Sequence, residues 1–154
     1  MEGQSSTPQT LERLLAEAAD RIERRSARDA YAAMQAGGAL LIDIRSSEDR
    51  ERDGVVPGSL HIPRTVLEWR VAPDSDWRSP HVGGLDREII LICDHGDSTV
   101  FATATLLDLG FTKASDVIGG FLAWKAAGLP VASAPAERRG GDELAGMRGP
   151  DEGL

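Results

Sequence analysis

The stretch EIILICDHGDST at residues 88–99 decides the expected fold. Its first five residues form a short, largely apolar run, which is typical of a strand buried on both faces of a parallel sheet. After a loop that contains Gly96, apolar residues recur at helical spacing from Ser98 to Leu109, and Gly110 occupies the position of a C-terminal glycine cap. The order of strand, loop and helix predicts one unit of an α/β fold.

The same alternation continues on both sides of this stretch. Residues 39–44 form a second buried-strand pattern after a double glycine, and residues 116–118 predict another short strand. Residues 26–29 have the form of a capping box that opens a short helix, and residues 121–127 predict another helix with Trp124 inward. We therefore expect an α/β layered fold with a central, mainly parallel sheet flanked by helices.

Three less regular segments lie between the predicted strands. The charged run at residues 46–53 predicts a solvated helical turn. Residues 64–70 predict a short helix that turns three apolar side chains inward, Val66, Leu67 and Trp69. Residues 72–85, with two prolines and two adjacent glycines, predict a long surface loop.

The chain of 154 residues fits one domain with an extension at each end. Helically spaced leucines between Thr7 and about Arg25 predict an appended amphipathic helix, so residues 1–24 are expected to form an N-terminal extension. Residues 133–154 contain almost no apolar side chains and are expected to be a disordered acidic tail. The domain itself is expected at residues 25–132.

Composition limits the classes of function. A net charge of −8 argues against binding to nucleic acid or an anionic membrane, since both need clustered lysine and arginine. No apolar stretch resembles a signal peptide or approaches the roughly 20 residues of a membrane span, so a cytoplasmic location is expected. The three histidines, His61, His81 and His95, lack metal-ligand spacing. Neither a metal nor a cofactor is therefore expected.

The single cysteine, Cys93, is the candidate catalytic residue. It could be an inert core thiol, but ligands of open parallel sheets bind at the carboxyl ends of strands, where Cys93 is expected. Backbone N–H groups around Gly96 and the start of the helix near Ser98 would stabilise a thiolate or a persulfide anion. The hydroxyls of Ser98 and Thr99 could donate to the sulfur or serve only as helix caps.

Four motifs stand in order along the chain: LIDIR at 41–45, VPGSLHIP at 56–63, the loop at 93–99, and GGFLAWKAAGLPV at 119–131. Together they resemble the rhodanese homology domain. The resemblance implies a central parallel sheet flanked by helices and a ping-pong sulfurtransferase cycle. In that cycle Cys93 takes sulfane sulfur from a small donor and passes it to a thiol or another thiophilic acceptor, which could be a protein.

The resemblance also implies a substrate-binding loop made of Asp94, His95, Gly96, Asp97, Ser98 and Thr99. Many family members carry arginine or lysine in this loop, whereas His95 is the one candidate cation here. It could assist proton transfer, bind an anion or have no role. Asp94 and Asp97 would oppose a thiolate and repel thiosulfate if they point inward, but they could also face solvent.

Asp43 and Arg45 could tune the site indirectly. The favoured interpretation is structural: either a buried aspartate at the strand end bonded to backbone donors, or an ion pair that ties the sheet to the following segment.

Two other functions compete with sulfur transfer. The absence of a loop arginine or lysine suggests a weakly active or non-catalytic module for sulfur sensing or protein binding. Phosphatase or arsenate reductase activity is suggested by related loops in which arginine follows the cysteine by six positions, but Thr99 stands there in this chain.

Overall fold

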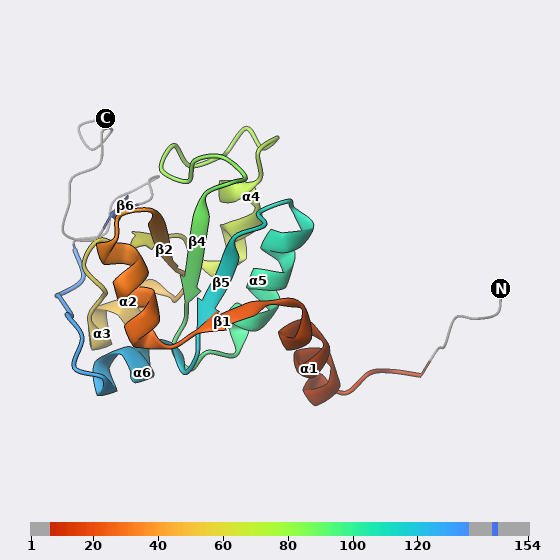
Figure 1. Ribbon diagram of the computed structural model, residues 1–154, viewed down its shortest axis with the longest axis horizontal. Coiled ribbons are helices and arrows are strands. Elements are labelled where there is room, and N and C mark those ends of the chain that lie inside the picture. The colour runs from red at the N-terminus through yellow and green to blue at the C-terminus, as the bar shows by residue number, and fades with distance from the viewer. Residues whose placement is uncertain (1–6, 136–142, 145–154) are drawn as a thin grey trace.

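A six-stranded sheet forms the centre of the structure (Figure 1), a computed structural model that describes residues 7–135 and 143–144. The strands are β1 (Glu23–Arg25), β2 (Ala39–Asp43), β3 (Leu60–His61), β4 (Glu88–Ile92), β5 (Ala114–Val117) and β6 (Glu143–Leu144). Their order across the sheet is β1-β5-β4-β2-β3-β6, and every neighbouring pair is parallel except β3 with β6. The predicted α/β fold with a mainly parallel sheet is confirmed.

Helices cover both faces of this sheet (Figure 1). They are α1 (Leu11–Arg21), α2 (Ala27–Gln35), α3 (Ser47–Asp53), the 3-10 helix η1 (Arg64–Val66), α4 (Leu67–Val71), α5 (Ser98–Asp108) and α6 (Gly120–Ala126). The predicted cap of α2 is present, since the Ser26 side chain accepts a hydrogen bond from the Asp29 amide at 3.1 Å. Such a cap contributes about 1 kcal/mol.

Strand β4 is buried on both faces, as its apolar run predicts. Ile89 and Leu91 join the core cluster that includes side chains of α4 and α5. Ile90 and Ile92 join the cluster that includes side chains of α2 and α6, with Trp124 fully buried among them. Because successive side chains of a strand point to opposite faces, this one apolar run packs against the helices on both sides of the sheet.

Helix α1 lies outside α5 as a further layer (Figure 1). Ala18 of α1 packs against Val100 and Ala104 of α5. The expectation that this helix continues to about Arg25 is wrong, because the backbone becomes extended at Ile22 (φ −116°, ψ 157°). The next three residues form β1, which pairs with β5 and so satisfies the backbone groups along that edge of the sheet.

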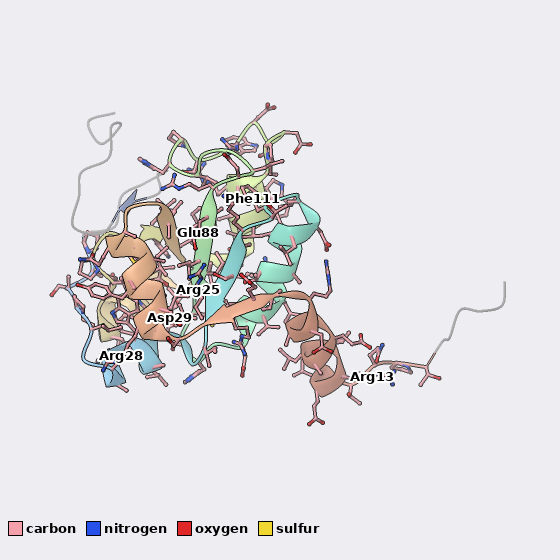
Figure 2. The ribbon with its side chains drawn as sticks, viewed as in Figure 1. Arg13, Arg25, Arg28, Asp29, Glu88 and Phe111 are labelled. Carbon is pink, nitrogen blue, oxygen red and sulfur yellow. The ribbon has the colours of Figure 1, made fainter. Side chains whose placement is uncertain are left out.

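The edge strand β1 is also tied down by its side chains. Figure 2 shows Arg25 and Glu88 side by side, and their ion pair connects β1 with β4 across the intervening β5. On the way, Arg25 Nε donates a hydrogen bond to Ser115 Oγ at 3.0 Å. A short, charged strand is therefore held by ion pairs where apolar burial is scarce.

Two expectations about buried side chains need correction. In the helical segment after β3, Leu67 and Val71 are fully buried, whereas Val66 and Trp69 are exposed by 39% and 58%. Residues four apart share one helix face, so Leu67 and Val71 occupy the inward side and leave Trp69 outside. In the charged run before β3, Arg50 of α3 is buried rather than solvated, because its Nε lies 3.4 Å from Asp43 Oδ2.

Most of the predicted tail lies outside the described residues, which omit 136–142 and 145–154. Within that tail, β6 pairs with the edge of β3. No helix in the described part of the chain is both long and apolar enough to span a bilayer.

Candidate active site

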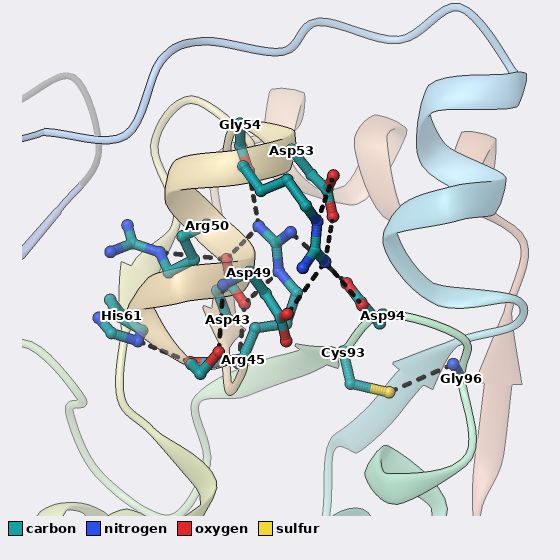
Figure 3. A network of polar contacts seen from close by, with 12 residues as sticks. Asp43, Arg45, Asp49, Arg50, Asp53, Gly54, His61, Cys93, Asp94 and Gly96 are labelled. Atoms are coloured by element: carbon teal, nitrogen blue, oxygen red, sulfur yellow. Dashed lines mark hydrogen bonds and ion pairs between the residues drawn. The ribbon is translucent and has the colours of Figure 1, made fainter.

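Cys93 lies immediately after β4, at the carboxyl end of the parallel strands. Its side chain is only 6% exposed. The Gly96 amide donates a hydrogen bond to Cys93 Sγ at 3.2 Å (Figure 3), and Thr99 Oγ1 lies 3.5 Å from the same sulfur. The loop therefore brings Cys93 together with two of the predicted loop residues, Gly96 and Thr99.

Two glycine positions allow the loop to close around the cysteine. Gly96 has φ +90°, and a Cβ there would lie 2.6 Å from the Gly119 nitrogen. Gly120 has φ +61°, and its Cβ would collide with the backbone of Cys93 and Asp94. Only glycine adopts these conformations in so little space. The double glycine before α6 thus supports the loop from outside it.

The start of α6 also holds the loop through backbone hydrogen bonds. The Phe121 amide donates to the Cys93 carbonyl at 2.7 Å, and the Leu122 amide donates to the Asp94 carbonyl at 3.2 Å. These bonds satisfy two carbonyls that the end of β4 leaves unpaired. The fourth motif of the sequence therefore packs directly on the third.

The Asp94 carboxylate points toward two arginines and away from the sulfur, which turns toward Gly96 (Figure 3). Its Oδ1 lies 3.7 Å from Arg45 Nη1, and its Oδ2 lies 3.6 Å from Arg52 Nη2. Both contacts are attractions between opposite charges, and they hold the carboxylate on this side of the loop. Asp94 therefore presents a compensated charge to the site.

Arg45 is buried behind the loop and is held by Asp43. Its Nε and Nη2 donate to the two Asp43 oxygens at 3.0 and 2.8 Å, and Nη2 also donates to the Gly54 carbonyl at 2.8 Å. Its guanidinium carbon lies 4.0 Å from the centre of the Phe121 ring. The Arg45 guanidinium thus connects Asp43 of β2 with Gly54 after α3, and it also reaches the active loop through Asp94.

The Arg52 side chain is exposed and forms ion pairs with three carboxylates, those of Asp49, Asp53 and Asp94. It donates hydrogen bonds to Asp53 at 2.8 Å and to Asp49 at 3.0 Å, both shorter than its contact with Asp94. The hydrogen bond with Arg52 lowers the pKa of Asp53 below its usual value. Sequence reasoning assigned this run to a solvated face and so missed its contact with the loop.

A second carboxylate, that of Asp116 in β5, is linked to the site through Thr99. Asp116 is fully buried and accepts a hydrogen bond from Thr99 Oγ1 at 2.8 Å. Arg24 of β1 binds the same carboxylate through both of its oxygens, at 2.9 and 3.0 Å, and donates to the Gly96 carbonyl at 2.7 Å. Neither Arg24 nor Asp116 was a candidate from the sequence. The one available signal was the acidic residue that opens the predicted short strand at 116–118, because a carboxylate that becomes buried in a sheet requires a partner.

The remaining loop side chains face solvent. His95, Asp97 and Ser98 are exposed, so the sequence hypothesis that both Asp94 and Asp97 could point at the sulfur does not describe this loop. Asp97 occupies the N-cap position of α5 without a side-chain capping bond. The Thr99 hydroxyl is not a cap either, because it donates to Asp116.

Nothing in the described residues resembles a metal centre. Within 7–135 and 143–144, no three side chains of histidine, cysteine, aspartate or glutamate gather as ligands would. The His61 ring instead lies 2.8 Å from the Arg45 carbonyl, where it supports the segment after β2.

Comparison with known proteins agrees with this geometry. The family model of the rhodanese-like domain matches residues 26–127. The chain is 34% identical to thiosulfate sulfurtransferase 16, chloroplastic, of Arabidopsis thaliana over 98 residues, which are 61% of this chain and 80% of the relative.

Solved structures extend the likeness. One from Rhodopseudomonas palustris, described as a protein of unknown function and possible tyrosine phosphatase, is 31% identical with a TM-score of 0.75. The match covers 83% of this chain and 98% of that one. A human single-domain sulfurtransferase is 27% identical with a TM-score of 0.57, over 67% of this chain and 95% of its own.

Proposed function

Since the chain belongs to the rhodanese-like domain family, we propose that it is a sulfurtransferase that carries the transferred sulfur as a persulfide on Cys93. One observation carries the proposal. The sulfur of Cys93 stands at the carboxyl end of β4 and accepts the Gly96 N–H at 3.2 Å, while the neighbouring Asp94 charge is turned toward arginines. A thiolate or persulfide anion in that position receives a donor and meets little repulsion.

The first half-reaction loads the cysteine. The Cys93 thiolate attacks the outer, sulfane sulfur of the donor and forms a new S–S bond. The bond between that sulfur and the rest of the donor breaks, and the leaving group departs with the electron pair, as sulfite from thiosulfate or as a thiolate from a persulfide. The outer sulfur of Cys93 then carries the negative charge.

The second half-reaction unloads it. A thiolate or another thiophilic acceptor attacks the outer sulfur, and the S–S bond to Cys93 breaks with the electron pair returning to the Cys93 thiolate. Because Cys93 is only 6% exposed, small donors and slender acceptor thiols suit the site best. A protein acceptor would have to present its thiol on a flexible segment.

Charge and cysteine content support the expected partners and location. We do not propose nucleic acid or membrane as a partner, because a net charge of −8 opposes both. A cytoplasmic location suits the proposal, since a reducing compartment keeps a lone thiol free to react.

Mass spectrometry tests the proposal directly. After incubation with thiosulfate, a low-molecular-weight persulfide or polysulfide, the protein should gain about 32 Da, the mass of one sulfur atom, and lose it to an added thiol. The matched control is Cys93→Ser, which keeps the size of the side chain and cannot hold the sulfur. If none of these donors leaves an adduct on the wild-type protein, the proposal is wrong.

A weakly active sensing or binding module is the second candidate. The low exposure of Cys93 and the absence of arginine or lysine from residues 94–99 favour it. Turnover close to the uncatalysed rate, together with a partner that Cys93→Ser protein still retains, would support this candidate over the enzyme.

We do not propose the phosphatase activity suggested for the Rhodopseudomonas palustris protein. Thr99 stands where an arginine would clamp a phosphate, and its hydroxyl is held by Asp116 at 2.8 Å. Hydrolysis of an aryl phosphate that disappears in Cys93→Ser would overturn this conclusion.

A further inference from the structure

Arg24 of β1 brings a guanidinium to the active loop, which has no arginine or lysine of its own at residues 94–99. This residue lies outside the region matched by the family model, residues 26–127. Arg24 and Asp116 are direct neighbours in the parallel pairing of β1 with β5. The register of an edge strand therefore brings the guanidinium to the loop.

Arg24 holds the loop residue whose amide faces the sulfur. Its Nη2 donates to the Gly96 carbonyl at 2.7 Å, while the Gly96 amide donates to Cys93 Sγ at 3.2 Å. Gly96 has φ +90° and packs closely against Gly119 on one side of the loop. Arg24 adds a directed hydrogen bond to the Gly96 carbonyl, which helps to hold its N–H on the sulfur.

Asp116 orients the Arg24 guanidinium and also accepts the hydrogen bond of the Thr99 hydroxyl, which lies beside the sulfur. It is fully buried and accepts from Arg24 Nε at 2.9 Å and from Thr99 Oγ1 at 2.8 Å. A carboxylate only accepts, so the single hydroxyl hydrogen of Thr99 points to Asp116. Thr99 then turns a lone pair toward Sγ, 3.5 Å away, and in this arrangement does not donate to a thiolate.

The charges of the loop act on Arg24 in turn. Its pKa lies above the usual value, chiefly through the hydrogen bond with Asp116; burial lowers it, and the charges of Asp116, Asp97 and Cys93 raise it further. Arg24 is thus electrostatically coupled to the sulfur as well as to its bonded partner.

We propose that Arg24 is a positioning residue of the sulfur site, which holds the Gly96 amide on Cys93 and selects reagents and donors that carry a negative charge. Its preference for anionic sulfur donors rests on the proposed function. Its effect on the reactivity of Cys93 does not, and can be measured without any sulfur transfer.

Alkylation of Cys93 tests the charge at the site. Iodoacetamide is neutral and iodoacetate is an anion of similar size, and Cys93 is the only cysteine, so the ratio of the two rates measures the local potential at one atom. Arg24→Gln exposes the Asp116 charge and should lower the iodoacetate to iodoacetamide ratio about fivefold, the effect of one unit charge over several ångströms in a partly solvated site. Asp116→Asn exposes the Arg24 charge and should raise the ratio.

Arg25→Gln is the matched control. Arg24 and Arg25 are adjacent and 28% and 29% exposed, but Arg25 pairs with Glu88 at the opposite end of β4 from Cys93. The ratio should stay at the wild-type value in this variant. Ratios that move in the same direction in Arg24→Gln and Asp116→Asn, or that do not move, would overturn the proposal.

Arg24→Lys separates the effect of charge from that of geometry. It also keeps the proposal testable if Arg24→Gln folds poorly. Lysine keeps the charge but cannot bind the carboxylate and the Gly96 carbonyl with a planar fork. The ratio should therefore persist while the iodoacetamide rate falls. An iodoacetamide rate equal to that of the wild type would contradict the positioning role.

The two proposals fail in different ways. If the alkylation ratios of Arg24→Gln and Asp116→Asn change as expected but no persulfide forms on Cys93, the proposed sulfurtransferase activity is wrong and the role of Arg24 stands. If Arg24→Gln forms the persulfide as well as the wild type and its iodoacetate to iodoacetamide ratio is unchanged, the role of Arg24 is wrong and the sulfurtransferase activity stands.

Discussion

Two acidic residues flank Cys93, and the structure holds them in different ways. Asp116 is fully buried and receives direct hydrogen bonds of 2.8 to 3.0 Å from Thr99 and Arg24. The Asp94 side chain is 25% exposed and faces its arginines at 3.6 and 3.7 Å without a direct hydrogen bond to its Oδ1. The Asp116 side is a buried set of direct hydrogen bonds that reaches Gly96 through Arg24, whereas the Asp94 side is a looser, partly exposed charge contact.

The difference follows from solvent and distance. A buried ion pair is costly to separate because removal of one partner leaves the other charged and desolvated. A half-exposed pair is screened by water and salt and contributes about 1 kcal/mol or less. Substitutions on the two sides should therefore differ in kind as well as in size.

Removal of the Asp116 carboxylate should have the largest effect. Asp116→Ala leaves Arg24 without its partner and the Thr99 hydroxyl without its acceptor, which should lower the free energy of unfolding by about 3–5 kcal/mol. Urea denaturation followed by circular dichroism measures this. Asp108→Ala, which breaks an exposed ion pair with Arg21, is the control and should cost under about 1 kcal/mol. Equal losses in the two variants would contradict the structural role of Asp116.

Substitution of Gly120, which packs against the backbone of Cys93 and Asp94, should have the second largest effect. Gly120→Ala combines φ +61° with a Cβ that meets the Cys93 and Asp94 backbone, so we expect a loss of about 2–3 kcal/mol and slower alkylation of Cys93. Gly128→Ala separates the two causes, because Gly128 has φ +74° with nothing within 4 Å of the added Cβ. It should cost about 1 kcal/mol and leave the alkylation rate unchanged. A milder effect at Gly120 than at Gly128 would show that the close approach is unimportant.

The sequence predicted the parts of the site that are local in the chain. The apolar run of β4 and the helical spacing of α5 place Cys93 and its loop, because burial on both faces and amphipathic periodicity are written in consecutive residues. The double glycine before α6 was expected as a turn. Its contact with the loop comes from packing, which the pattern does not encode.

The parts that were missed depend on pairing between distant segments. Strand β1 has only three residues, all charged, so no alternation of apolar and polar side chains marks it. These residues form a strand because they pair with the edge of β5. The register of that pairing places Arg24 beside Asp116. In the same way, the direction of Asp94 is set by Arg45 and Arg52, which follow a different strand.

The Asp94 side should show the smallest effect and the clearest dependence on salt. Asp94→Asn removes one negative charge beside Arg45 and Arg52, which both keep other carboxylate partners, so we expect a stability change within about 1 kcal/mol and about a twofold rise in the iodoacetate to iodoacetamide ratio at low salt. The rise should vanish near 1 M salt, where the screening length is about 3 Å. Asp86→Asn, exposed at the other end of β4, is the control and should leave the ratio unchanged. A rise that survives high salt would mean that Asp94 is coupled to Cys93 as closely as Asp116, and the contrast between the two sides would no longer hold.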